Sequence, residues 1–135
     1  MSRSMPIAFK GATTPPPLGR RLRSLIFDVV DESMRPLLKA GDRILVDTAA
    51  YRHHVPEVGD VVVFRDPQEP RRRLVKRVAA PVDPARGGGV SVLGTDPEHS
   101  RDSRSFGPVP PRLILGKAWY RTGPPGREGS LEQVR

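Results

Sequence analysis

Short hydrophobic runs alternate with turn signals along the middle of the chain. Gly41-Asp42, Gly59 and the three glycines at 87–89 each come just before such a run. The runs predict strands over residues 25–30, 43–48, 60–65, 73–79, 90–93 and 113–121. Short strands separated by turns are typical of a mainly β domain. The one helix that the pattern favours is a short stretch over residues 35–40, which ends at Gly41.

The two ends of the chain differ from the middle in composition. Residues 1–23 contain five basic residues, no acidic residue and three consecutive prolines at 15–17, so we expect a basic, mobile arm. Residues 122–135 begin with a Gly-Pro-Pro-Gly turn sequence at 123–126 and are expected to form a loose tail. The length of 135 residues fits one domain, which we place at 24–121.

The composition excludes several classes of function. The chain has no cysteine, which excludes a disulfide scaffold, a thiol nucleophile and a thiolate metal site. His53 and His54 are adjacent and would face opposite sides of a strand, so we expect neither a metal nor another cofactor. No apolar run approaches the roughly 20 residues of a membrane-spanning helix. We therefore expect a cytoplasmic or peripherally membrane-associated protein without a transmembrane segment.

The charge of the chain points to an anionic partner. There are 23 Lys and Arg against 15 Asp and Glu, a formal net charge of +8. A basic arm can contact acidic lipid or nucleic acid. The aromatic residues are scattered rather than interleaved with basic ones, which argues against stacking on nucleic acid. The sequence leaves two readings of the arm open: a peripheral contact with an anionic membrane, and a solvated tail without a partner.

Lys76 has surroundings that suit acid–base chemistry. On the strand predicted at 73–79, alternation places Leu74, Lys76 and Val78 on one face. Loss of water around the amine favours its neutral form and lowers its pKa, and a neutral amine can act as general base for a serine hydroxyl. The chain has four lysines against 19 arginines, and arginine cannot lose its proton. The alternative is a lysine that extends to water from a sheet edge.

Two further segments carry polar side chains that suit chemistry. The segment SMRP at 33–36 follows the first predicted strand. Read alone, it favours Ser33 as the cap of a short helix, with Met34 packed in the core. Residues 94–107 read by themselves as a solvated loop in which Asp102 and Arg104 form an ion pair of little energetic weight.

Taken together, these segments resemble type I signal peptidases, which are serine/lysine endopeptidases. The family pattern appears in order as SMRP at 33–36, GD at 41–42, PEVGDVVVF at 56–64, VKRV at 75–78, GTDPEHSRDSRSFG at 94–107 and GKAWYR at 116–121. The resemblance covers about residues 25–121 and implies a signal-peptidase-like β-fold of short antiparallel strands. Only 17 residues separate Lys76 from Gly94, so we expect a minimal catalytic domain without the extra domain that many members carry.

The resemblance also implies a role for each matching residue. Ser33 would be the nucleophile, with its backbone N–H in the oxyanion hole, and Lys76 would be the general base. Ser100 would orient the lysine amine. Four more residues would hold the site in shape, two in the turn and two in a loop ion pair: Met34, Pro36, Asp102 and Arg104.

The residues before Ser33 depart from the family pattern. The family often has a serine or glycine-serine there, and that side chain can complete the oxyanion hole. Here the positions are Asp31 and Glu32. An ionised carboxylate accepts hydrogen bonds and donates none, so these side chains are not expected to supply a second donor.

The function implied by the resemblance is the removal of a leader or signal peptide from a precursor protein. The family's N-terminal membrane anchor is missing from the pattern, so we expect a dedicated maturation protease, similar to those that process nickel-type superoxide dismutase. A general signal peptidase without its anchor is the alternative within the family. Outside it, the alternatives are a self-cleaving regulatory domain of the SOS-repressor type and a non-catalytic basic binding module.

Overall fold

One antiparallel sheet forms the body of the protein. The computed structural model describes residues 16–96 and 101–132. Within them the strands run in the order β1-β2-β6-β3-β4-β5, with β7 paired to β6. The strands are β1 (Ser24–Asp28), β2 (Arg43–Asp47), β3 (Val61–Arg65), β4 (Arg73–Pro81), β5 (Val90–Leu93), β6 (Ile114–Gly123) and β7 (Gly129–Ser130). The predicted mainly β fold is confirmed, because each predicted run overlaps one of β1 to β6.

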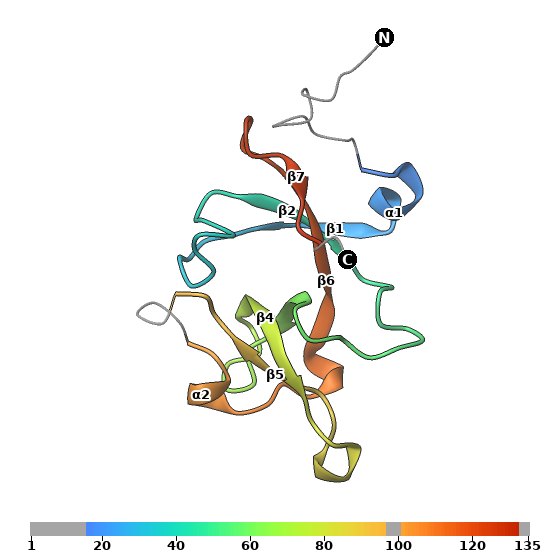
Figure 1. Cartoon of the computed structure of the whole chain (residues 1–135), viewed down its shortest axis with the longest axis vertical. Coiled ribbons are helices and arrows are strands. Elements are labelled where there is room, and N and C mark those ends of the chain that lie inside the picture. Colours follow the sequence, from blue (N-terminus) through green and yellow to red (C-terminus); the bar gives the residue numbers. More distant parts are fainter. Residues whose placement is uncertain (1–15, 97–100, 133–135) are drawn as a thin grey trace.

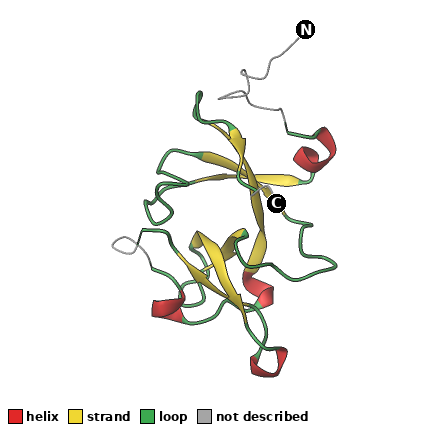
Figure 2. Ribbon diagram, in the orientation of Figure 1, coloured by secondary structure: helices red, strands yellow, loops and turns green. Residues whose placement is uncertain are grey.

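Helices occur only as short pieces in the connections of the described residues (Figure 2). They are α1 (Leu18–Leu22), α2 (Ser103–Phe106) and two 3₁₀ turns, η3 (Pro84–Arg86) and η5 (Pro111–Leu113). Asp83 and Asp102 each begin such a piece by accepting a hydrogen bond from the N–H two residues ahead. These pieces position loops and carry no buried face of their own, apart from Leu113 in η5.

Strand β6 connects the two halves of the sheet. Figure 1 shows it running from the region of β4 and β5 to the region of β1, β2 and β7. It pairs with β2 on one side and with β3 on the other. Both pairings contain register shifts, and such irregularities bend and twist a strand. The loop between β1 and β2 contacts the loop after β5 through two hydrogen bonds.

Two apolar clusters lie on opposite faces of β3. Val61 and Val63 belong to one cluster, with Val75 of β4 and the buried Met34. Val62 and Phe64 belong to the other. Alternating side chains of a strand point to opposite faces, so a continuous valine run reads as a strand that is covered on both sides.

The predicted helix over residues 35–40 is wrong, because this stretch folds as consecutive turns. Pro36 has no N–H to donate. The N–H groups that would continue a helix are taken by side chains instead. Lys39 N–H donates to Asp42 Oδ2 at 2.9 Å and Ala40 N–H donates to Glu32 Oε2 at 3.0 Å. Local side-chain acceptors of this kind compete with helix formation.

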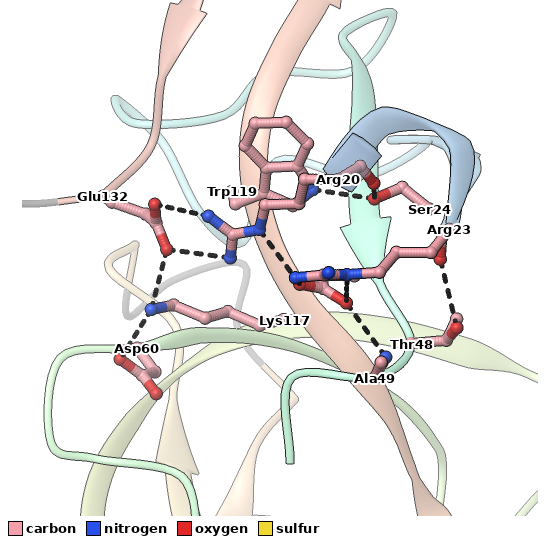
Figure 3. Close-up of polar contacts among 10 residues, drawn as sticks. Arg20, Arg23, Ser24, Thr48, Ala49, Asp60, Lys117, Trp119 and Glu132 are labelled. Atoms are coloured by element: carbon pink, nitrogen blue, oxygen red, sulfur yellow. Dashed lines mark hydrogen bonds and ion pairs between the residues drawn. The ribbon is translucent and has the colours of Figure 1, made fainter. Parts of the chain in front are cut away.

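Both ends of the described chain pack on the sheet, beyond the limits of 24 and 121 expected from sequence. Figure 3 shows the Arg20 side chain against Trp119 and Glu132. Its guanidinium donates to Asp47 at 2.9 Å and to Glu132 at 2.8 Å, and it lies 4.4 Å from the centre of the Trp119 ring. Strand β7 and the buried Leu131 continue the sheet and the core after Gly123.

Candidate active site

The turn after β1 holds Ser33 in the interior of the protein. Ser33 is 1% exposed, and the Met34 and Leu38 side chains on either side of the turn are fully buried in the first apolar cluster. Leu38 N–H donates to the Met34 carbonyl at 3.0 Å. Pro36 lies at the surface of the same turn. The burial of Met34 and Leu38 in this cluster therefore anchors the turn to the core.

Asp31 makes two hydrogen bonds with Ser33 through one oxygen. The Ser33 hydroxyl donates to Asp31 Oδ1 at 3.0 Å, and the Ser33 backbone N–H donates to the same oxygen at 3.1 Å. An Asp side chain that accepts from the N–H two residues ahead is a common local turn motif. In this structure the carboxylate of Asp31 thus accepts from both groups that the family resemblance assigns to nucleophilic attack and oxyanion binding.

Lys76 lies in the middle of β4, opposite Val62 of β3. The residue is 1% exposed, which agrees with the predicted burial of this face of the strand. A lysine without access to water is costly to keep charged. Its neighbours along the same strand face, Leu74 and Val78, are both buried in the second apolar cluster.

Burial and four charged residues act on the pKa of the Lys76 amine. Burial lowers the pKa of the Lys76 amine below its ordinary value. The carboxylates of Asp31 and Asp102 act in the opposite direction, and the guanidinium groups of Arg101 and Arg104 act in the same direction as burial. The neutral amine is therefore more populated than in an exposed lysine.

The loop after β5 is held by a buried carboxylate, Asp102. Arg104 donates to Asp102 through Nε at 3.0 Å and through its NH2 group at 2.6 Å. The backbone N–H groups of Arg104 and Gly94 also donate to this carboxylate, at 3.0 and 3.1 Å. Ser103 accepts from Val92 N–H of β5. These bonds join residues 102–104 to Val92 and Gly94 at the end of β5. Ser100 lies outside the described residues.

Two backbone-directed hydrogen bonds join this loop to the Ser33 turn. Asp96 N–H donates to the Ser33 carbonyl at 2.9 Å, and the Thr95 hydroxyl donates to the Arg35 carbonyl. The predicted site residues thus come from three places in the chain, and the turn and the loop are in direct contact. Asp31 from the turn and Asp102 from the loop both raise the pKa of Lys76 through their charges.

A shallow hollow adjoins the loop at Gly94 and Thr95. It has a volume of about 390 Å³ and is bordered by Val58 and Leu93 on its apolar side. Arg77, the residue after Lys76, also lines it, and the buried Arg77 Nε has no hydrogen-bond partner within the described part of the chain. The hollow therefore combines apolar surface with the side chain of an arginine and the backbone of Gly94 and Thr95.

Asp31 is the site residue whose contact sequence reasoning missed. The family pattern predicts a donor at this position, whereas the Asp31 carboxylate accepts from Ser33. The signal was local: an aspartate two residues before a serine can accept from the serine N–H and from its hydroxyl. Reading Asp31 as an acceptor for Ser33 itself would have found the contact.

The described residues contain no group of three or more histidine or acidic side chains placed to hold a metal ion. Nor does any helix among them have the length and apolar character to cross a membrane.

Comparison with known proteins assigns the family. The family model described as signal peptidase, peptidase S26, matches residues 21–82, a stretch that contains both Ser33 and Lys76. The mitochondrial ATP-independent inner membrane protease subunit 1a of Arabidopsis thaliana is 38% identical over 118 residues, covering 73% of this chain and 70% of that protein. The mitochondrial inner membrane protease subunit 1 of Schizosaccharomyces pombe is 34% identical over 108 residues, covering 68% and 69%. The probable signal peptidase I-1 of Synechocystis is 27% identical over 143 residues, covering 76% and 73%.

These matches show that the chain belongs to the signal peptidase family, peptidase S26. It is a serine peptidase of the signal-peptidase type. The resemblance drawn from the sequence motifs is confirmed at the level of the family.

Proposed function

We propose that the protein is an endopeptidase that removes an N-terminal leader from a precursor protein, with Ser33 as nucleophile and Lys76 as general base. The observation that carries this proposal is the burial of Lys76, which is 1% exposed and whose amine has a lowered pKa because of that burial. The mechanism also requires a serine. The buried Ser33 donates its hydroxyl hydrogen bond to Asp31, the same carboxylate whose charge acts on Lys76.

The proposed chemistry needs a neutral Lys76 amine within reach of the Ser33 hydroxyl. The hydroxyl proton of Ser33 moves to Lys76 Nζ as Oγ forms a bond to the scissile carbonyl carbon, and the carbonyl electron pair moves onto oxygen. The Ser33 backbone N–H would stabilise that oxyanion. The Lys76 ammonium then gives its proton to the leaving amine as the C–N bond breaks. Water, with Lys76 again as base, hydrolyses the acyl-enzyme.

Supporting roles fall to the residues around this pair. Ser100 is proposed to orient the lysine amine. The ion pair of Asp102 and Arg104 would hold the loop that carries Ser100. The hydrogen bond from Gly94 N–H to the Asp102 carboxylate supports this role. Met34, buried in the core, and Pro36 would keep the turn in shape.

The substrate proposed is an extended segment of a precursor protein, with the hollow beside Arg77 and Thr95 as the place where part of it lies. The relatives are named as inner membrane proteases and a probable signal peptidase, which supports a precursor with an N-terminal leader. Processing of one dedicated precursor, as with nickel-type superoxide dismutase, is the narrower form of this proposal. Processing of many different precursor proteins is the broader form of the proposal.

A peripheral contact with a membrane is also part of the proposal. Strand β1 ends the sheet, and its Leu25 and Ile26 side chains are exposed, as is Val30 just after it. Exposed apolar groups next to basic Arg21 and Arg23 suit an anionic bilayer surface. The names of the membrane-protease relatives point the same way.

The test of the dyad is cleavage of a leader-bearing precursor by the purified chain. Ser33→Ala and Lys76→Ala should each abolish cleavage while the circular dichroism spectrum stays native. Lys76→Arg should be equally inactive, because arginine keeps its proton. The matched controls are the exposed Ser105→Ala and Lys39→Ala, which should cleave normally. Full activity of Lys76→Arg would contradict the proposed base.

A further inference from the structure

The Asp31 carboxylate occupies the reactive side of Ser33. One oxygen, Oδ1, accepts from the Ser33 hydroxyl at 3.0 Å and from the Ser33 backbone N–H at 3.1 Å. In the mechanism proposed above, the hydroxyl must turn toward the amine of Lys76, and the N–H must bind the oxyanion. Both donors are engaged elsewhere in this arrangement.

We propose that Asp31 is a positioning residue that keeps the site at rest, and that the scissile carbonyl of a bound precursor displaces its carboxylate from Ser33. This proposal rests on the Ser33/Lys76 mechanism. The carbonyl oxygen of the substrate takes the place of Asp31 Oδ1 at the Ser33 N–H, and the hydroxyl is then free to donate to Lys76. No covalent bond of Asp31 forms or breaks.

Within the described part of the chain, Ser33 is the one residue that hydrogen-bonds the Asp31 side chain. No ion pair to Asp31 occurs there, whereas the adjacent Glu32 is paired with Arg35 at 3.3 Å and accepts from Ala40 N–H. Asp31 is also partly exposed to solvent. A carboxylate held by two hydrogen bonds to one residue, and partly exposed to solvent, can leave at the cost of those two bonds and of its attraction to the Lys76 amine.

Displacement of Asp31 would also change the electrostatics of the base. The groups that act on Lys76 are Asp31 from the turn and three residues from the loop, Asp102, Arg101 and Arg104. The Asp31 carboxylate raises the pKa of the amine and opposes the effect of burial. When it turns away, the protonated amine loses a favourable partner, while Asp102 remains fixed by Arg104. Substrate binding would therefore release the hydroxyl and favour the neutral base in one movement.

The variant that tests this is Asp31→Asn, with Glu32→Gln as matched control, because it removes a neighbouring carboxylate that does not contact Ser33. The first readout is titration of the lysine amines by NMR in protein labelled with ¹³C at lysine Cε. The chain has four lysines, and loss of a signal in Lys76→Met assigns Lys76. Asp31→Asn should shift the Lys76 titration to lower pH, and Glu32→Gln should not. An unchanged Lys76 titration in Asp31→Asn would overturn the proposal.

The second readout is the pH profile of cleavage of a peptide that spans a Ser33-dependent cleavage site. In Asp31→Asn the acid limb of kcat/KM, which reports the free enzyme, should move to lower pH. The acid limb of kcat should stay, because Asp31 is already displaced in the bound state. Loss of activity at every pH as deep as that of Lys76→Ala would overturn the proposal by making Asp31 itself the base. Normal cleavage by Ser33→Ala and Lys76→Ala would instead contradict the dyad, whatever the titration shows.

Discussion

Asp96 donates its backbone N–H to the carbonyl of Ser33 at 2.9 Å, so the loop after β5 is hydrogen-bonded to the proposed nucleophile. The attachment is backbone to backbone and depends on the path of the loop rather than on a particular side chain. That path is set by Asp102, whose buried carboxylate accepts from Gly94 and Arg104. The position of Ser33 is therefore linked to a carboxylate about seventy residues away in sequence.

We predict that Asp102→Ala lowers both stability and activity. It leaves the Gly94 N–H without its buried acceptor, at a cost of about 1–3 kcal/mol in the free energy of unfolding. A shift of the loop should lower kcat/KM by roughly 10–100-fold. Denaturant unfolding and a cleavage assay measure the two effects. Asp83→Ala is the control, since Asp83 accepts from Ala85 N–H in the same way at a distance from the site. Equal activity of the two variants would rule out this role of Asp102.

Replacing Lys76 with methionine should separate stability from activity. A buried amine is costly to desolvate, and methionine fills a similar volume without the charge. We expect Lys76→Met to raise the free energy of unfolding by roughly 0.5–2 kcal/mol and to abolish cleavage. Lys117→Met is the contrasting variant. Lys117 pairs with Glu132 at 2.8 Å, so its loss should cost about 0.2–1 kcal/mol and leave activity intact. A destabilised, active Lys76→Met would contradict the account.

Stability should fall at acid pH through the Asp42–Arg127 pair. Burial raises the pKa of Asp42, but hydrogen bonds from Arg127 and from Lys39 N–H outweigh burial and bring it below its usual value. The unfolded chain therefore binds the proton first as pH falls below about 4. The stabilisation from this group is present above that pH and is lost as pH falls through the lower pKa of the folded state.

Asp42→Asn should remove part of this acid dependence, while Asp28→Asn at an exposed pair with Arg43 should remove less. Unfolding followed from pH 7 to pH 2 measures it, and an unchanged slope in Asp42→Asn would contradict the prediction.

Binding to anionic vesicles should depend on the exposed apolar side chains of β1. Ile26→Glu replaces an exposed apolar side chain with a charge that anionic lipid repels. Burial of an isoleucine contributes roughly 1.5–3 kcal/mol, so binding should weaken about tenfold or more. Vesicle co-sedimentation at low and high salt measures this. Val55→Glu, at an exposed valine between β2 and β3, is the control, and equal binding by both variants would place the contact elsewhere.

The sequence predicted the strands well because their signals are local. Valine runs such as Val61 to Val63 and the preceding Gly59 fix a strand and its start within a few residues. The burial of Lys76 was also predictable, because strand alternation places it between Leu74 and Val78. In contrast, the helix predicted over residues 35–40 rested on a short stretch that ends at Gly41. The competing acceptors Asp42 and Glu32 became evident only in three dimensions.

The packing of the described residues 16–23 and 122–132 was not predictable from composition. Prolines, glycines and basic residues suggested free ends. Arg20 is instead paired with Glu132, across a separation of 112 residues, and β7 pairs with β6. A contact between two residues so far apart in the chain leaves no periodic pattern in either segment. The Asp31 contact with Ser33 is a different case, because an aspartate two residues before a serine is a local signal for such a contact.

The central claim is that Ser33 cleaves a precursor with the help of Lys76. Its most direct test compares protein N-termini by mass spectrometry in the native host that carries the wild-type chain or Ser33→Ala. The account predicts that at least one mature N-terminus is lost in Ser33→Ala and that its longer precursor accumulates. Loss of a single N-terminus would identify a dedicated maturation protease, and loss of many a general one. An identical set of N-termini, with the variant folded and present at wild-type level, would contradict the claim.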